Sequence, residues 1–157
     1  MDHTKLTEYE LVVNSYRKAW NRKKDPVNKS ECYEKLKTYG EAGMKELLEY
    51  FLKYGDAYDQ EQILDIMVDC YGNDLFPIAK EALKRDNLLE DQMYMLLWYM
   101  ECAELTNKYS LKAMYIATDL LNHKYEDVRE KAQEVINVKT AFLEANNISL
   151  DVKYEPA

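Results

Sequence analysis

The sequence predicts an all-α protein built from about four helical hairpins, and three observations lead to that fold class. Only four glycines and three prolines occur among 157 residues, too few for the turns that a sheet protein needs. Strong helix formers such as Leu, Ala, Glu, Lys and Met are plentiful. Three segments, 43–72, 73–106 and 108–138, each combine a leucine-rich helix, a short acidic turn and a second helix. They recur at roughly 30 to 38 residues, the spacing of stacked helical repeats.

The first forty residues predict one further pair of helices. Thr7 and Glu10 have the spacing of a capping box, so a helix is expected from there to about Lys24. Its apolar face consists of Leu11, Val12, Tyr16, Ala19 and Trp20. Pro26 ends that helix, and a second one is expected over 28–39. Gly40 and Gly43 should flank the turn into the first clear repeat.

Each repeat shows apolar residues at helical spacing on both of its helices. The first has Met44, Leu47, Leu48, Phe51 and Leu52, then Ile63, Leu64, Met67, Val68 and Tyr71, with Gly72 closing the hairpin. In the second, Asn73 or Asp74 is the expected cap and Pro77 lies in the first turn. Its second helix buries Met93, Leu96, Leu97, Met100 and Ala103, and the last helix buries Val128, Ala132, Val135, Ile136, Lys139 and Phe142. We expect that helix to end near Ala145 and residues 148–157 to form a tail.

Segment 110–138 resembles a HEAT repeat. An apolar helix and an acidic turn are followed by Asp127-Val128-Arg129-Glu130-Lys131-Ala132, which is similar to the family's Asp/Glu-Val-Arg-x-x-Ala at the start of its second helix. Segment 73–106 shares the proline-bearing first helix but lacks the Val-Arg pair, and segment 43–72 shares only the layout. The resemblance covers roughly 95 residues. It implies an α-α superhelix, a HEAT-like solenoid, whose second helices line a concave surface that binds protein or nucleic acid, and it implies no chemistry.

Length and charge restrict the function further. A chain of this length is expected to form one domain over 1–157. The net charge is −8, and residues 41–157 carry 12 basic against 23 acidic side chains. Nucleic-acid binding depends on basic side chains that displace counterions, so the acidic body disfavours it and favours a basic protein partner. Segment 17–24 is the one basic cluster with an interleaved aromatic, and we interpret it as the solvated last turn of a helix.

Cysteine usage and hydropathy bear on the location of the protein. Cys32, Cys70 and Cys102 cannot all pair with one another and lack Cys-x-x-Cys spacing, so we expect buried thiols in a reducing compartment rather than disulfides or zinc ligands. No apolar segment has the length of a signal peptide or of a membrane span. A cytoplasmic location without membrane attachment is therefore expected.

The sequence offers no set of catalytic or metal-binding residues. Only His3 and His123 are present, which is too few for a di-iron helical bundle or a His-Glu-x-x-His zinc helix. His123 is expected to satisfy carbonyl groups at a helix end. Neither a glycine-rich phosphate loop nor an activated nucleophile is recognisable, so we expect no enzyme activity and no cofactor.

The polar faces of the second helices are the candidate binding surface. If the apolar stripes are packed inside a solenoid, the opposite faces look onto one concave side. Acidic rows then flank a central aromatic pair, a composition suited to recognising a basic protein. The candidate residues are Glu61, Asp65, Asp69, Asp91, Tyr94, Trp98, Glu101, Glu126, Glu130 and Glu134. The fourteen tyrosines strengthen this hypothesis, although rings at such positions often belong to the core.

Three functions remain as hypotheses. The first is a stoichiometric inhibitor of a basic protein, such as a bacterial immunity protein that neutralises a nuclease toxin, a class of small acidic helical proteins that this chain resembles without sharing a motif. The second is a HEAT-like scaffold or adaptor that binds a peptide or protein without inhibiting it. The third is an enzyme or nucleic-acid-binding repeat protein that uses segment 17–24. For each of the first two we expect a monomer or a weak dimer.

Overall fold

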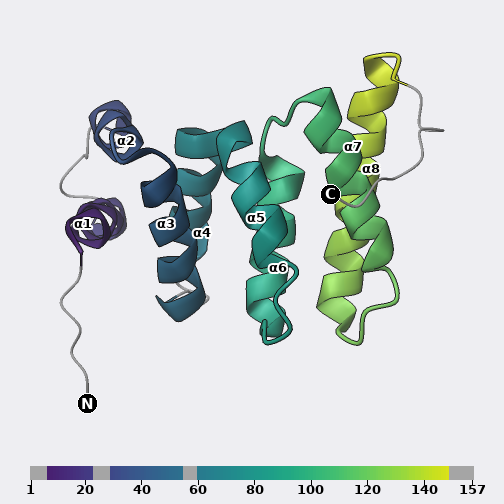
Figure 1. The fold of residues 1–157 in the computed structure, drawn as a ribbon, viewed down its shortest axis with the longest axis horizontal. Helices are drawn as coiled ribbons and strands as arrows, with labels where there is room; N and C mark the ends of the chain where they lie inside the picture. The colour runs from purple at the N-terminus through teal and green to yellow at the C-terminus, as the bar shows by residue number, and fades with distance from the viewer. Residues whose placement is uncertain (1–6, 23–28, 55–59, 149–157) are drawn as a thin grey trace. The chain divides into compact units, whose positions relative to one another are not determined.

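The chain forms two compact units, Met1–Tyr71 and Gly72–Ala157. The structure is a computed structural model, and it describes residues 7–22, 29–54 and 60–148. Every regular element within those ranges is helical, which confirms the all-α prediction (Figure 1). Along the same ranges no helix is long and apolar enough to cross a membrane.

The described residues of unit 1 form five consecutive helical elements. They are α1 (Glu8–Arg22), α2 (Lys29–Lys37), α3 (Gly40–Tyr54), α4 (Gln60–Asp65) and the π-helix η1 (Ile66–Tyr71), which continues α4 without a break. The predicted capping box is confirmed, because the Thr7 amide donates to Glu10 Oε2 at 2.9 Å and the Glu10 amide donates to Thr7 Oγ1 at 3.1 Å. The π-helix was not predicted; π-helices are rare and are often found at functional sites.

The sequence prediction for Gly43 is wrong. Gly43 lies inside α3 rather than beside a turn, and it is buried. A Cβ atom at this position would stand 2.6 Å from Tyr39 Cβ and 2.9 Å from Tyr9 Cε2. The rings of Tyr9 and Tyr39 meet edge to face at 5.1 Å between centroids. Gly43 therefore lets these two tyrosines approach the backbone of α3. Gly40, with φ of +59°, begins that helix in the left-handed region as glycine readily does.

Tyrosines supply much of the core of unit 1. Tyr9, Tyr16, Tyr33, Tyr50 and Tyr71 are all buried. The hydroxyls of Tyr9 and Tyr71 are 2.7 Å apart, and Tyr71 also donates to the Leu36 carbonyl at 3.0 Å. Buried hydroxyls require such partners. The tyrosine richness that suggested a binding surface thus serves, in this unit, an interior network of hydrogen bonds. Leu11, which was assigned to the core, is 52% exposed.

These buried tyrosines predict a steep loss of stability in alkali. Burial raises the pKa of Tyr16 to about 12 and raises the pKa values of Tyr9, Tyr33 and Tyr71 as well, because the phenolate loses its hydration. Folding therefore gains stability from neutral tyrosines below the unfolded pKa of about 10, and that gain disappears as pH rises through the folded values. Phenolate absorbance should rise first for exposed tyrosines and then in one step coincident with loss of the helical circular dichroism signal. A single titration near pH 10 with the helices intact would contradict the buried network.

Unit 2 is described independently of unit 1. Its elements are the 3-10 helix η2 (Gly72–Leu75) followed by α5 (Phe76–Ala82), α6 (Glu90–Cys102), α7 (Asn107–Asp119) and α8 (Glu126–Ala145). Helix α8 packs against both α6 and α7. The predicted end of the last helix at Ala145 is confirmed. Within this unit the core includes Met93, Leu96, Leu97, Met100, Ala103, Val128, Ala132 and Val135, all assigned to the interior by their spacing. Two residues that were assigned to the interior differ: Ile136 is half-buried, and Phe142 is 40% exposed.

Neither expected cap begins α5. Its N-cap is Leu75, which offers no side-chain hydrogen bond, and Pro77 stands in the first turn as predicted. Asn73 instead accepts a hydrogen bond at 2.9 Å from the amide of Thr106, the N-cap of α7. The start of one hairpin is thereby joined to the start of the next.

Candidate protein-binding surface

Helices α6 and α8 run in the same direction and contact each other through polar side chains. Near the start of α8 Lys131 contacts Glu101, Tyr94 and Trp98 of α6, and two turns later Lys139 reaches the carbonyl of Ala103 at 2.8 Å. Because the contacts advance along both helices together, their first turns lie at the same end. Each first turn is acidic, as the helix macrodipole favours.

A buried lysine lies at the centre of this surface. The ammonium group of Lys131 stands 5.1 Å from the ring centroid of Tyr94 and 5.7 Å from that of Trp98. It donates to Glu101 Oε2 at 2.9 Å and also to Glu134. We call these five residues, Tyr94, Trp98, Glu101, Lys131 and Glu134, the ammonium cluster. Two rings and two carboxylates form the kind of site that stabilises a desolvated cation.

The cluster keeps Lys131 charged. Burial alone disfavours the ammonium, but the hydrogen bonds with Glu134 and Glu101 outweigh burial and raise the pKa of Lys131. The hydrogen bond from Lys131 in turn lowers the pKa of Glu134. Lys139, in contrast, is buried beside a carbonyl rather than an ion pair, and desolvation lowers the pKa of its ammonium group.

Tyr94 and Trp98 lie at the boundary between core and surface. Both are half-buried, and their rings meet edge to face at 6.1 Å between centroids. Neither ring is sealed in the interior, where Tyr99 and Met100 of the same helix lie. Each ring therefore offers one face to Lys131 while part of its area remains open to solvent.

Four of the seven unit 2 candidates contact Lys131 directly, namely Tyr94, Trp98, Glu101 and Glu134. The remaining three, Asp91, Glu126 and Glu130, are exposed on the same two helices. Sequence reasoning missed Lys131, although its position three residues before Glu134 is a spacing at which ion pairs form on a helix. We call α6 and α8 with these eight residues the acidic–aromatic surface.

The unit 1 candidates are arranged differently. Glu61 is exposed, but the side chain of Asp65 is only 20% exposed and accepts hydrogen bonds from within the unit. Its donors are Tyr16, Tyr33 at 2.6 Å and Lys29 at 3.0 Å. Lys29 also pairs with Asp69 at 3.0 Å. Asp65 is therefore an internal acceptor, not the water-facing carboxylate that the sequence suggested, and a single trough across all three repeats stays a prediction.

The pKa values of Asp65 and Asp69 are shifted in opposite directions. Burial would raise the pKa of Asp65, but hydrogen bonds with Asp69, Tyr16, Tyr33 and Lys29 lower it below its usual value. The pKa of Asp69 is raised, chiefly by its hydrogen bond with Asp65. When this pair of carboxyl groups takes up one proton, Asp69, the more exposed of the two, therefore binds it in preference to Asp65.

Several other sequence interpretations need correction. Arg17, taken as part of a solvated basic cluster, is buried, donates to the Tyr50 hydroxyl and lies 5.4 Å from that ring's centroid. Residues 23–28 lie outside the described part of the chain. Cys70 is buried as expected, but Cys32 is half-buried and Cys102 is exposed. His123 Nδ1 accepts a hydrogen bond from the Tyr125 amide at 3.2 Å instead of satisfying a carbonyl.

Within residues 7–22, 29–54 and 60–148, no group of three or more histidine, cysteine or acidic side chains is placed to hold a metal ion. Comparisons with protein-family models, with curated proteins and with solved structures find no match to this chain.

The ammonium cluster predicts a measurable loss of stability on replacement of Lys131. Lys131→Met keeps the length of the aliphatic stem but leaves Glu101, a largely buried carboxylate, without its cation. We expect a decrease of about 1–2 kcal/mol in the free energy of unfolding, measured by urea denaturation, since Glu134 can return to water. The matched change Lys124→Met, at an exposed lysine over the Tyr125 ring, should alter stability by less than about 0.5 kcal/mol. Equal effects of the two substitutions would refute the ion-pair account.

Proposed function

We propose that this protein is a non-enzymatic, stoichiometric binding module whose acidic–aromatic surface docks a basic protein. The observation that supports it most is the ammonium cluster, in which Tyr94, Trp98 and two carboxylates already surround a lysine side chain of the same chain. Partly exposed rings beside carboxylates are typical of the residues that contribute most to protein interfaces. Exposed acids around them would accelerate encounter with a cationic surface.

The specific form of the proposal is an inhibitor that neutralises a basic toxin, such as a nuclease, as a cytoplasmic immunity protein does. Small size, acidity and a surface that needs no cofactor support this form. A HEAT-like stack of the hairpins, with α6 and α8 lining its concave side, belongs to the same proposal.

A photoreactive cross-linking residue in place of Glu130 tests the proposal in the native host. Glu130 is exposed on α8 and does not belong to the ammonium cluster, so its replacement should leave the fold intact. We expect one basic protein to be captured from position 130 and not from the exposed control position Glu34 on α2 of unit 1. The purified captured protein should lose its activity when one equivalent of this chain is added. Capture of only acidic proteins would contradict the proposal.

A scaffold or adaptor is the alternative, and the separation into two compact units favours it. Two units can engage two partners without inhibiting either. If the protein captured at position 130 keeps full activity in the complex, the scaffold function replaces the inhibitor function.

A further inference from the structure

Unit 2 carries a second charged surface whose sign is opposite to that of the acidic–aromatic surface. Helices α5 and α7 run side by side in the same direction (Figure 1), and the rings of Phe76 and Tyr109 stack at 4.7 Å between centroids near their starts. One turn beyond each ring stands a lysine, Lys80 on α5 and Lys112 on α7. Lysines 84 and 108 lie one turn from these. We call Lys80, Lys84, Lys108 and Lys112 the lysine quartet.

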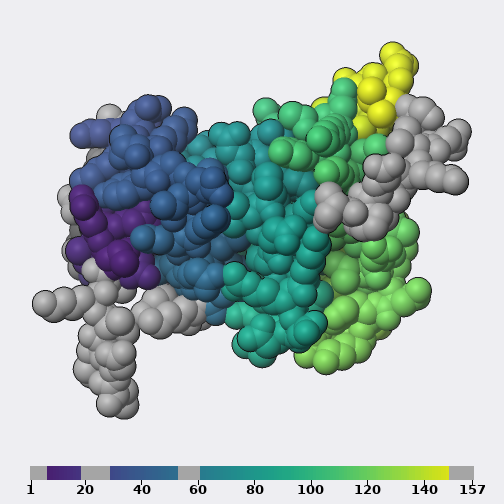
Figure 2. Space-filling model, in the orientation of Figure 1, coloured from purple at the N-terminus to yellow at the C-terminus, as the bar shows by residue number. Residues whose placement is uncertain are grey.

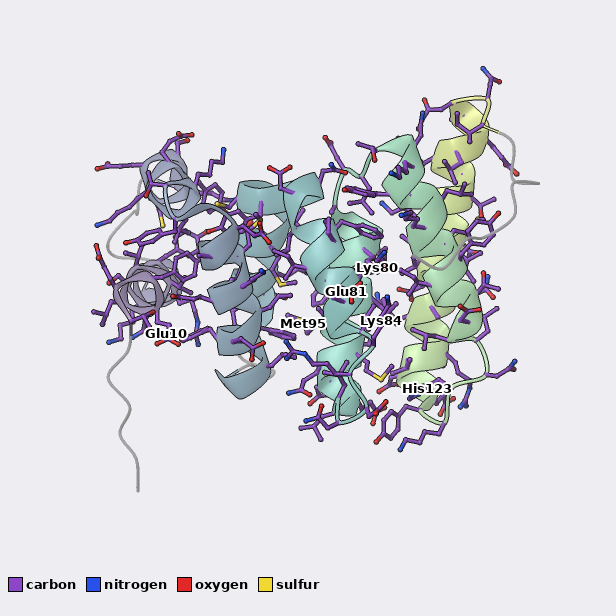
Figure 3. The ribbon with its side chains drawn as sticks, in the orientation of Figure 1. Glu10, Lys80, Glu81, Lys84, Met95 and His123 are labelled. Atoms are coloured by element: carbon purple, nitrogen blue, oxygen red, sulfur yellow. The ribbon has the colours of Figure 1, made fainter. Side chains whose placement is uncertain are left out.

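The four lysines are close enough for the charges of the other three to act on Lys80. Figure 3 shows Lys80, on α5, and Lys84, in the turn that follows α5, on the side that faces α7, and Figure 2 shows α5, in teal, at the visible surface of unit 2. After burial, the charges of Lys112, Lys84 and Lys108 are the main causes that lower the pKa of Lys80. The one acid that counteracts them is Glu81, which pairs with Lys84 at 3.1 Å. Across the described part of the chain, no carboxylate forms an ion pair with Lys80, Lys108 or Lys112.

This arrangement works against the stability of the unit. Like charges four residues apart on a helix repel, and Lys108 and Lys112 form such a pair on α7. Lys108 also lies in the first turn of α7, where the macrodipole disfavours a positive charge. The other α-helices have acidic first turns, whereas α5 and α7 have none. Positive charges that break these local rules, as Lys80, Lys108 and Lys112 do, are expected at functional sites.

We propose that the lysine quartet binds a short acidic protein helix that lies along α5 and α7, with carboxylates one helical turn apart. Lys108 and Lys112 are four residues apart, about 6 Å along the axis of α7, and a helix with acids at the same spacing repeats equally. Lys80 of α5 lies close enough to this pair to feel its charge, so one ridge of carboxylates can pair with lysines of both helices.

The surroundings of the quartet favour a short protein segment over other polyanions. Glu104 and Asp119 lie at the two ends of α7, and Asp86 follows α5, so a long nucleic-acid strand would meet negative charge on leaving the quartet. The quartet contains no arginine, the side chain best suited to bidentate phosphate contacts. None of the exposed large apolar residues found in the structure, Leu11, Leu89, Val138 and Phe142, lies on α5 or α7, so these helices lack the apolar anchors of a membrane-surface helix.

The test uses the full chain and a fluorescent, stapled 20-residue helical peptide with glutamate at every fourth residue. A peptide of identical composition with its glutamates distributed around the helix is the ligand control. Anisotropy should show binding of the first peptide at least about ten-fold tighter than that of the second, and weakening with salt. Lys80→Glu with Lys112→Glu should reduce binding at least about ten-fold. The same charge change at exposed unit 1 lysines, Lys37→Glu with Lys45→Glu, should alter it less than about two-fold.

A stability measurement separates ligand binding from a structural role of the lysines. Because the quartet is repulsive, Lys80→Gln with Lys112→Gln should leave the melting temperature unchanged or raise it by about 1–3 °C. A lower melting temperature would mean that the lysines stabilise the fold and would overturn the proposal. Absence of peptide binding would overturn it too, as would equal or tighter binding of a 20-nucleotide RNA or of phosphatidylserine vesicles.

Discussion

Replacement of Asp65 by alanine is expected to lower the free energy of unfolding by about 2–4 kcal/mol, because three donors lose one acceptor. Tyr16 and Tyr33 are buried, so their hydroxyls would lose a charged acceptor and keep the longer contact of 3.4 Å with each other, whereas Lys29, at 40% side-chain exposure, can recover water. Urea denaturation of the full chain followed by circular dichroism measures the loss. Glu61→Ala, one turn earlier on α4 and exposed, is the matched control and should change stability by less than about 0.5 kcal/mol. Equal losses for both variants would show that Asp65 is not an internal acceptor.

The pH dependence of stability provides a second readout of the same carboxylate. The folded pKa of Asp65 lies below the unfolded value of about 3.9, so the folded state binds fewer protons in that range. The stabilisation is therefore present above about pH 4 and is lost as pH falls through the folded pKa. Asp65→Asn removes this group and should flatten the acid side of the stability profile. An unchanged acid profile in Asp65→Asn would contradict a depressed pKa.

Gly43→Ala is expected to destabilise unit 1 by about 1–3 kcal/mol, although alanine normally stabilises a helix over glycine by about 1 kcal/mol. The new methyl group would stand 2.6 Å from Tyr39 Cβ, an atom fixed to the backbone that no rotamer change can move away. Backbone displacement would also disturb Tyr9, whose hydroxyl bonds to Tyr71. Thermal and urea unfolding should both show the loss. In the control Ala42→Gly, at the exposed neighbouring position, only the propensity loss of about 1 kcal/mol is expected. A gain of stability in Gly43→Ala would show that Tyr9 and Tyr39 do not pack against α3.

The helices and the interior of unit 2 could be predicted from sequence because both follow from local spacing. The buried residues Met93, Leu96 and Met100 of α6 and its C-cap Ala103 follow one another at intervals of three and four, and such periodicity identifies the inward face. The capping box at Thr7 likewise depends on residues only three apart. Short-range patterns of this kind need no knowledge of what the helix packs against.

The polar partnerships could not be predicted, because they join residues far apart in the chain. Asp65 meets Tyr33 across 32 positions and Lys131 meets Glu101 across 30. Regular helical spacing also places Asp65 on the same polar face as Glu61 and Asp69. The change from α4 to the π-helix η1 at Ile66 alters that spacing directly after Asp65, and no sequence signal announced it. Composition could count the tyrosines but could not distinguish interior hydroxyls from surface rings.

Quenching of Trp98 fluorescence tests the acidic–aromatic surface most directly. Trp20→Phe leaves Trp98 as the only tryptophan, and the quenchers are cesium and iodide ions, which have opposite charge. Because Trp98 is half-exposed among carboxylates, cesium should quench it clearly better than iodide, and Asp91→Asn with Glu130→Gln should reduce the difference. Stronger quenching by iodide, or no quenching by either ion, would contradict a surface that attracts a basic protein to Trp98.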